Sequence, residues 1–215
     1  MILLELFSGT GSVGKSWLSS KHRVISLDIS SKFGAEIIGD VLEWDYKTLK
    51  NCPDFIWAST PCEQYSIARS RAKNPRSFQL ADAIVNKTWE IIEHYKKVNP
   101  ALVWFIENPD SSLLWKRFKF TDYVRLDYCQ YGTPYRKRTR IATNNIRWIP
   151  RALCDSTACP RCENGKHIQT AQQGPSMRGG VRVIFANCSL GQLHCLPQGL
   201  NDQIQRPSRM FACTI

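Results

Sequence analysis

A glycine-rich turn between an apolar strand and a helix opens the chain, and it restricts the folds available to the sequence. Residues 2–4 are apolar, residues 5–14 contain three glycines, and Trp17 continues a helical pattern. Glycine lets the backbone approach a ligand closely, and the helix that follows offers its first N–H groups to that ligand. The opening therefore predicts an α/β fold with a site for a nucleotide-like cofactor after the first strand.

Two later strands are predicted to end in acids that suit the same site. Residues 23–28 end at Asp28, about 20 residues after the glycine turn, where folds of this kind bind a ribose hydroxyl pair. Residues 35–41 form a third predicted strand, with Asp40 and Val41 near its end. The carboxyl ends of parallel strands share one edge of a sheet, so the three ends together predict a cofactor cradle.

Strand and helix patterns alternate through the first two-thirds of the chain. Further strands are predicted at residues 54–59, 101–106, 124–129 and 140–143. Residues 78–95 predict a helix that covers the sheet, with an apolar face formed by Leu80, Ile84, Trp89, Ile92 and Tyr95. This order indicates an α/β fold with a doubly wound, mostly parallel sheet.

A thiol and a carboxylate follow two of these predicted strands. Pro61-Cys62 comes after residues 54–59, and Glu107-Asn108 comes after residues 101–106. A thiol that attacks a ring carbon and a carboxylate that manages a ring proton can act together on a flat heterocycle, which indicates covalent catalysis on a pyrimidine. Taken singly, Cys62 is more often a small buried residue and Glu107 more often a cap, so the interpretation depends on their combination with the glycine turn.

The same glycines also match a phosphate-binding pattern. Residues 9–16 satisfy G-x-x-x-x-G-K-[ST], with Lys15 and Ser16 as the last two residues. In that alternative the chain is a phosphate-loop nucleotide hydrolase, and Asp28 binds magnesium. The alternative gives no role to Cys62 or Glu107, and we therefore favour covalent catalysis.

Four motifs follow one another along the chain. They are Phe7-Ser-Gly9-Thr-Gly11, Pro61-Cys62, Glu107-Asn108, and Tyr131-Gly-Thr-Pro134 followed by Arg138-Thr-Arg140. Their order and spacing resemble those of the cytosine-5 DNA methyltransferase family, and more narrowly a compact branch found in viruses and phages. The resemblance implies a Rossmann-like methyltransferase fold and an enzyme, a DNA (cytosine-5)-methyltransferase, that uses S-adenosylmethionine.

The resemblance also implies roles for individual residues around a flipped cytosine. Cys62 would attack ring carbon 6, and Glu107 would contact ring nitrogen 3 and the exocyclic amine. Arg138 and Arg140 would steady the base and its phosphates. One extra residue within 136–140 leaves a second assignment open, in which Arg136 and Arg138 form the arginine pair.

Ten residues are expected to contact S-adenosylmethionine. In the resembling family Asp28 would bind the ribose and Asp40 would lie near the adenine amine. The whole set is Phe7, Ser8, Gly9, Thr10, Gly11, Asp28, Ile29, Asp40, Val41 and Pro61. The family's closing Gly-Asn-Ser motif has no convincing copy in this chain, so one wall of the cofactor pocket has no predicted residues.

The pattern changes after residue 150, where thiols and an imidazole cluster. Cys154, Cys159, Cys162 and His167 are suitable ligands for a tetrahedral structural zinc, with Cys188 or Cys195 as possible substitutes. Such a metal would stabilise a segment too small for a core of its own. We therefore expect two units, a catalytic domain over residues 1–150 and a small zinc-binding recognition region over residues 151–215.

The chain is strongly basic, with a formal net charge of +11 and a pI near 9.4. Residues 115–151 carry ten Lys or Arg against two Asp. A basic surface favours a polyanionic partner, and we expect double-stranded DNA, with tRNA or a non-catalytic DNA-binding role as alternatives. We found no apolar run long enough to cross a membrane, so we expect a soluble, monomeric, intracellular protein, in the nucleus or cytoplasm of the host if it is viral.

Overall fold

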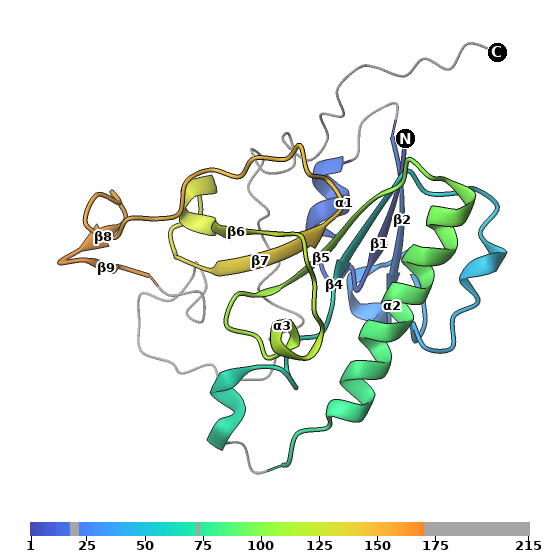
Figure 1. The fold of residues 1–215 in the computed structure, drawn as a ribbon, viewed down its shortest axis with the longest axis horizontal. Helices are drawn as coiled ribbons and strands as arrows, with labels where there is room; N and C mark the ends of the chain where they lie inside the picture. Colours follow the sequence, from blue (N-terminus) through green and yellow to red (C-terminus); the bar gives the residue numbers. More distant parts are fainter. Residues whose placement is uncertain (18–21, 72–73, 170–215) are drawn as a thin grey trace.

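A central sheet organises the molecule in the computed structural model, which describes residues 1–17, 22–71 and 74–169 (Figure 1). Within these residues, seven strands form one sheet in the order β3-β2-β1-β4-β5-β7-β6. The strands are β1 (Ile2–Leu6), β2 (Arg23–Asp28), β3 (Ile37–Ile38), β4 (Phe55–Ser59), β5 (Val103–Pro109), β6 (Tyr123–Asp127) and β7 (Arg138–Thr143). A two-stranded ribbon of β8 (Cys162–Glu163) and β9 (Lys166–His167) lies beyond this sheet.

The sheet is parallel from β3 to β5 and antiparallel at its other edge. β1 pairs in parallel with both β2 and β4, and β4 pairs in parallel with β5. β7 runs antiparallel to β5 and to β6. The order 3-2-1-4-5 is that of a Rossmann-type sheet, so the predicted mostly parallel α/β fold is confirmed. Ligands bind such sheets where the strand order reverses, which here is the carboxyl edge between β1 and β4.

The two main helices cover opposite faces of the sheet. α1 (Ser12–Trp17) contributes Trp17 to a core that also contains Leu3 and Trp57. α2 (Phe78–Val98) packs instead on the face that carries Leu4 and Ile56. Successive side chains of a strand point to opposite faces, which explains why neighbouring residues of β1 belong to different cores. Both faces are therefore covered, as the apolar strand sequences predict.

Five short helical segments complete the described fold. They are the α-helix α3 (Leu114–Arg117) and the 3-10 turns η1 (Ser31–Phe33), η2 (Tyr46–Thr48), η3 (Ile67–Arg71) and η4 (Tyr128–Tyr131). The predicted strand at residues 35–41 is reduced to β3, and the predicted strand at 124–129 ends early because η4 begins at Tyr128. No helix in the described part of the chain has the length and apolar character needed to cross a bilayer.

The buried face of α2 contains Ile92 and Tyr95, as expected, but differs from the prediction at Leu80 and Trp89. Leu80 and Trp89 are 54% and 37% exposed, whereas Ala81, Val85 and Thr88 are buried. Ala81 and Val85 pack with Tyr65 and Leu114, which lie outside the sheet. Trp89 lies at the side of the helix and packs edge-on against Trp104 at a ring distance of 5.0 Å.

A buried carboxylate joins β1 to α1. Glu5 is 3% exposed, and its Oε2 accepts a hydrogen bond of 2.9 Å from the N–H of Gly14. A Cβ at Gly14 would lie 2.6 Å from this oxygen and 2.8 Å from Val24, so only glycine allows the close approach. Burial raises the pKa of Glu5 to about 7, although the Gly14 and Val13 amides oppose the increase.

We predict that Glu5→Gln changes how stability depends on pH. The pKa of Glu5 is raised from its usual 4.5 to about 7 in the folded protein, so the folded state retains a proton that the unfolded state has released. The free energy of unfolding of the wild type should therefore fall as pH rises from 4.5 to about 7, by an amount on the order of 3 kcal/mol. Glu5→Gln should remove this fall, as measured by urea unfolding across that range.

The exposed Glu43 provides the control. Glu43→Gln should give a stability profile parallel to that of the wild type. A Glu5→Gln profile that still falls with the wild-type slope would contradict the assignment.

Candidate active site

The glycine turn, Pro61-Cys62 and Glu107-Asn108 meet at the carboxyl edge of the sheet. Leu6 of β1 pairs with Ala58 of β4, and Ser59 at the end of β4 pairs with Glu107 of β5. The parallel register therefore places the ends of three strands side by side, although their residues lie far apart in the sequence (Figure 1). This edge is also the ligand edge of a Rossmann-type sheet.

The glycine turn has an unusual backbone and an orphaned polar atom. Phe7, Gly9 and Gly11 have φ angles of 58°, 49° and 68°, in the left-handed region that favours glycine. For Phe7 this conformation is uncommon, and such backbone strain clusters at functional sites. Ser8 is buried, and its Oγ has no hydrogen-bond partner within the described residues. A bound ligand could satisfy this hydroxyl.

Asp28 ties the glycine turn to the end of β2. Its Oδ2 accepts a 2.7 Å hydrogen bond from the Gly9 N–H, and its Oδ1 accepts one of 2.8 Å from the Ser30 N–H. A carboxylate has about four acceptor positions, so these two bonds leave capacity for the hydroxyls of a ribose. Asp28 therefore has a structural role that the sequence pattern did not indicate.

The remaining predicted cofactor residues surround the same edge. Asp40 is half-buried, and its Oδ1 accepts a 2.9 Å bond from the Leu42 N–H. Val41 is buried, whereas Ile29 is 71% exposed directly after β2. Thr10 is half-buried, with its Oγ1 3.0 Å from the Ser12 hydroxyl.

The phosphate-loop alternative does not suit this geometry. Gly14 lies inside α1, and its N–H is bonded to the Glu5 carboxylate. The Val13 amide also donates to Glu5. These are the amides that would bind a phosphate, and the carboxyl group of Glu5 already occupies them.

Asn108 supports the segment that carries Cys62. The Asn108 side chain is fully buried, and its Nδ2 donates hydrogen bonds of 2.8 Å to the Thr60 carbonyl and 3.1 Å to the Thr60 hydroxyl. Thr60 directly precedes Pro61-Cys62, and both of those residues are half-buried. The amide of Asn108 therefore fixes the backbone that presents the thiol next to the end of β5.

Lys137 is the cation beside the predicted acid. Glu107 is 4% exposed, and its Oε1 lies 3.2 Å from Lys137 Nζ. The ammonium also lies 5.0 Å from the centre of the Tyr128 ring. Burial works against the charge of Lys137, but the attraction of Glu107 and of other groups, including the Cys62 thiol, outweighs burial and raises the pKa of Lys137.

The sequence patterns did not single out Lys137, but strand alternation contains the signal. Ile141 pairs with Glu107, and Arg140 pairs with Asn108. Paired residues of neighbouring strands point to the same face of the sheet, so Glu107 and Ile141 share a face. Side chains alternate along a strand, so Lys137, just before β7 begins, points to this face as well. Arg138 and Arg140 belong to the opposite face.

The predicted arginines are bound to acids of the protein itself. Arg138 holds Asp127 with bonds of 3.0 and 2.7 Å, and Arg136 contacts the same carboxylate at 3.2 Å. Arg140 lies 2.9 Å from Asp110 and stacks 4.4 Å from the centre of the Tyr123 ring. Each arginine of the two possible pairs therefore binds a carboxylate other than Glu107.

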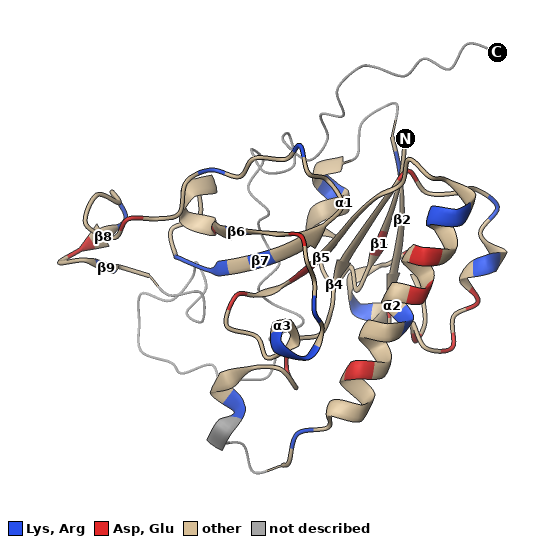
Figure 2. Cartoon of the chain, viewed as in Figure 1, with Lys and Arg blue, Asp and Glu red and all other residues tan. Residues whose placement is uncertain are grey.

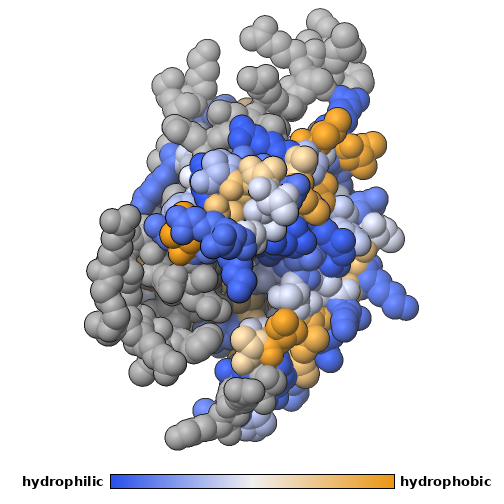
Figure 3. Space-filling model, turned by 90° about the vertical axis from the view of Figure 1, so that its left-hand side faces the viewer, coloured by the Kyte–Doolittle hydropathy of each residue, from blue (hydrophilic) through white to orange (hydrophobic). Residues whose placement is uncertain are grey.

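The basic residues of this region form a mixed surface. Figure 2 shows Lys and Arg along β7 and at α3, close to acidic residues. Arg117 pairs with Asp82, and Arg125 pairs with Asp110. Figure 3 shows hydrophilic residues over much of the face on the side of β8 and β9. The local charge excess is thus partly compensated by ion pairs.

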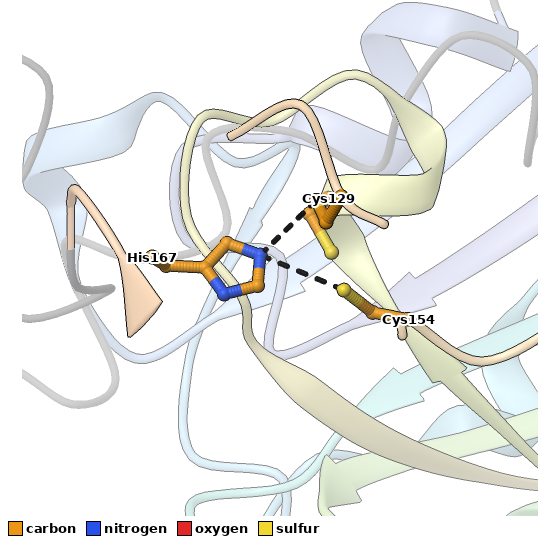
Figure 4. A group of neighbouring side chains, drawn as sticks. Cys129, Cys154 and His167 are labelled. Carbon is orange, nitrogen blue, oxygen red and sulfur yellow. Dashed lines mark hydrogen bonds between the residues drawn. The ribbon is translucent and has the colours of Figure 1, made fainter. Parts of the chain in front are cut away.

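A second group of side chains lies beside β6 and suits a metal ion. The ligand atoms of Cys129, Cys154, Cys159 and His167 all lie within 4.8 Å of one another. His167 Nε2 is 3.7 Å from Cys154 Sγ and 3.6 Å from Cys159 Sγ, and Figure 4 shows the imidazole turned toward the thiols. A tetrahedral zinc bound to sulfur at about 2.3 Å and to nitrogen at about 2.0 Å separates two such atoms by about 3.5 Å. The observed distances fit this geometry.

The group differs from the predicted ligands at one position. Cys129 of η4 takes part, whereas Cys162 lies 3.2 Å from His167 Nδ1 and packs against the same thiols. Cys129 precedes the other ligands by a long stretch of chain, so ligand spacing alone could not indicate it. Cys188 and Cys195, the possible substitutes, lie outside the described residues.

The metal-type group is attached to the sheet. The Cys154 N–H donates a 2.9 Å bond to Asp127 Oδ2, and Arg161 donates a 3.0 Å bond to the Cys129 carbonyl. Burial alone would raise the pKa of Asp127, but the Arg138 guanidinium and the Cys154 N–H outweigh burial and lower it. One buried carboxylate thus connects the arginine segment to the cysteine cluster.

Comparison with known proteins supports the resemblance of the sequence motifs. No family model matches the chain. The chain is 28% identical over 201 residues to a protein of Frog virus 3 (isolate Goorha) described as a probable DNA (cytosine-5)-methyltransferase. The match covers 84% of this chain and 91% of the relative. The resemblance to the cytosine-5 DNA methyltransferase family is confirmed.

Solved structures with a similar arrangement are methyltransferases of lower identity. The methyltransferase EhMeth of Entamoeba histolytica has a TM-score of 0.43 at 18% identity, over 66% of this chain and 52% of that one. A putative DNA modification methyltransferase from an E. coli prophage has a TM-score of 0.47 at 14% identity, over 72% and 52%. The Dnmt2 methyltransferase of S. pombe has a TM-score of 0.45 at 14% identity, over 76% and 57%. This chain therefore spans about half the length of these solved proteins.

We predict that Asn108→Ala destabilises the protein by about 1–3 kcal/mol, because the buried Thr60 carbonyl loses its donor. Urea unfolding measures the loss. Thr60→Val is the comparison, since it removes only the longer bond to the hydroxyl, and its cost should be smaller. Wild-type stability of Asn108→Ala would show that this amide does not support the Cys62 segment.

Proposed function

We propose that this protein transfers a methyl group from S-adenosylmethionine to carbon 5 of cytosine in double-stranded DNA. The observation that carries the proposal is the meeting of Cys62 and Glu107 at adjacent strand ends, beside the glycine turn. The match to the viral relative, which extends over most of both chains, supports the same activity.

The cofactor would lie at the carboxyl edge between β1 and β4. The orphaned Ser8 hydroxyl, the positive φ angles and the free acceptor positions of Asp28 fit a nucleoside cofactor. The residues proposed to hold it are Phe7, Ser8, Gly9, Thr10, Gly11, Asp28, Ile29, Asp40, Val41 and Pro61. S-adenosylmethionine supplies an electrophilic methyl group when bound.

Cys62 and Glu107 would divide the activation of the base. The Cys62 thiolate forms a bond to carbon 6, the π bond between carbons 5 and 6 breaks, and carbon 5 becomes nucleophilic. Glu107, a carboxylate beside Lys137 in the free protein, would take a proton from solvent as the base binds and share it with nitrogen 3, which stabilises the charge that reaches this atom. After carbon 5 gains the methyl group, loss of its proton to solvent and departure of the thiolate restore the ring. The base must leave the duplex, because a stacked base does not expose carbon 6.

Substrate binding would use the basic segment of β7 and its neighbours. Arg138 and Arg140 remain the proposed contacts to the base and its phosphates, and Asp127 and Asp110 hold their guanidinium groups in place. A guanidinium uses several N–H groups, so an ion pair on one side leaves donors for phosphate. The net charge of +11 supports a polyanionic substrate.

A structural zinc would attach the second unit to the first. We propose Cys129, Cys154, Cys159 and His167 as its ligands, with Cys162 beside the free nitrogen of the imidazole. Burial lowers the pKa of His167, which favours the neutral ring that metals bind. Residues 1–150 would then form the catalytic domain, and residues 151–215 a recognition region anchored at η4.

We predict that Cys62→Ser abolishes methyl transfer to duplex DNA, because serine oxygen is a far weaker nucleophile for carbon 6. Transfer of labelled methyl from S-adenosylmethionine to duplex DNA and to tRNA measures this. Cys52→Ser is the matched control, since Cys52 is also a half-buried cysteine but lies before β4, at the other end of that strand. Cys52→Ser should keep full activity.

Other outcomes of this assay decide between the alternatives. Label in tRNA alone would support the same reaction with tRNA as its substrate. Full activity of Cys62→Ser would refute the covalent mechanism, and no label from the wild type would favour a non-catalytic DNA-binding protein.

We predict about one zinc per chain in protein purified without chelators, measured by elemental analysis. Cys129→Ser should lower the zinc content and the melting temperature, whereas Cys52→Ser should change neither. A zinc-free wild type of undiminished stability would refute the metal site. Equal zinc content in Cys129→Ser and in the wild type would show that Cys129 is not a zinc ligand.

A further inference from the structure

Lys137 occupies a position that the proposed mechanism has not used. Its side chain is 13% exposed and that of Glu107 is 5% exposed, so this ion pair is largely shielded from water. Burying a lysine is costly unless a partner compensates its charge. The burial of this ion pair therefore indicates that the positive charge of Lys137 has a function in the candidate active site.

The groups around the ammonium come from three elements. Glu107 approaches from β5 at 3.2 Å, and the Tyr128 ring of η4 lies at 5.0 Å. The pairing of Ser59 with Glu107 places the segment that carries Cys62, directly after β4, at the neighbouring strand end. Glu107 and a Cys62 thiolate are both anions in a region of low polarity. Two such anions repel each other unless a cation lies within reach of both.

The neighbouring cations are engaged elsewhere. Arg136 and Arg138 contact Asp127, and Arg140 contacts Asp110. Asp127 is itself compensated by these arginines, so it does not draw on Lys137. Among the described residues, Lys137 is the ionic partner of Glu107.

We propose that Lys137 is a positioning residue for the proposed methyl transfer. Its ammonium holds Glu107 through Oε1, which leaves Oε2 to face the base, and its charge stabilises the thiolate of Cys62. The part about Glu107 and the base rests on the proposed function. The part about Cys62 concerns the free protein and can be tested without any substrate.

The test is the rate at which iodoacetamide alkylates Cys62 in the full chain, measured by peptide mass spectrometry. The rate is measured from about pH 6 to about pH 9, which is roughly the range in which cysteine titrates. Lys137→Met should slow alkylation of Cys62 at neutral pH by about tenfold, since one unit in thiol acidity is a factor of ten. The pH profile should move to higher pH. Cys52 in the same molecules should react at the wild-type rate.

Two variants separate charge from structure. Lys137→Arg keeps the charge and should restore most of the Cys62 reactivity. Lys87 is a matched control, because its Nζ lies 3.0 Å from Glu90 and 4.9 Å from the centre of the Tyr46 ring, contacts like those of Lys137. Lys87→Met should leave the alkylation of Cys62 unchanged.

An unchanged alkylation rate and pH profile in folded Lys137→Met would overturn the proposal. If that variant does not fold, Lys137→Gln takes its place, because glutamine can still donate to Glu107 but carries no charge. The same slowing is expected, and wild-type reactivity of Lys137→Gln would equally overturn the proposal.

The methyl-transfer assay keeps this inference distinct from the proposed function. Slower alkylation in Lys137→Met, with a wild type that transfers no methyl group, would support the role toward Cys62 and reject the proposed enzyme. A wild type that transfers methyl groups, together with unaltered alkylation in Lys137→Met, would reject the role of Lys137 and support the proposed enzyme activity.

Discussion

The parallel pairing of β1, β4 and β5 is the constraint on which the candidate site depends. Helices cover both faces of this sheet, so its polar chemistry is displaced to the strand ends. The pairing of Ser59 with Glu107 brings Cys62 and Glu107 to neighbouring positions. The bond from Asn108 to Thr60 then locks one strand end to the other. A change in register would separate all of these groups at once.

Three buried acids show how the fold places charge around this edge. Glu5 is held by amides of α1, and its pKa rises to about 7 because burial outweighs these amides and the charge of Lys15. Asp127 is held by arginines and by the Cys154 N–H, which lower its pKa. Glu107 is held by Lys137. Of these three acids, Glu107 lies on the strand that pairs with the end of β4, which precedes Cys62, and for this reason we assign Glu107 and its ion pair to the proposed reaction.

The sequence patterns predicted the larger elements well and the boundaries less well. Long apolar runs give β1, β4 and β5, and the helical period gives α2, because these patterns reflect burial on a regular element. The short β3 and the early end of β6 depend on neighbouring chain segments. The apolar face of α2 was misjudged at Leu80 and Trp89, since Ala81 and Val85 of this helix pack with Tyr65 and Leu114, which lie outside the sheet.

The sequence by itself determined the α/β class, the order of the motifs and the identity of the proposed nucleophile and acid, because these follow from local runs of residues. Only the tertiary structure decided the partners of charged groups. It paired Glu107 with Lys137, gave the predicted arginines to Asp127 and Asp110, and brought Cys129 to the other metal-type ligands. Such pairs join residues of different elements, and their distances depend on strand register and loop paths that no local pattern records.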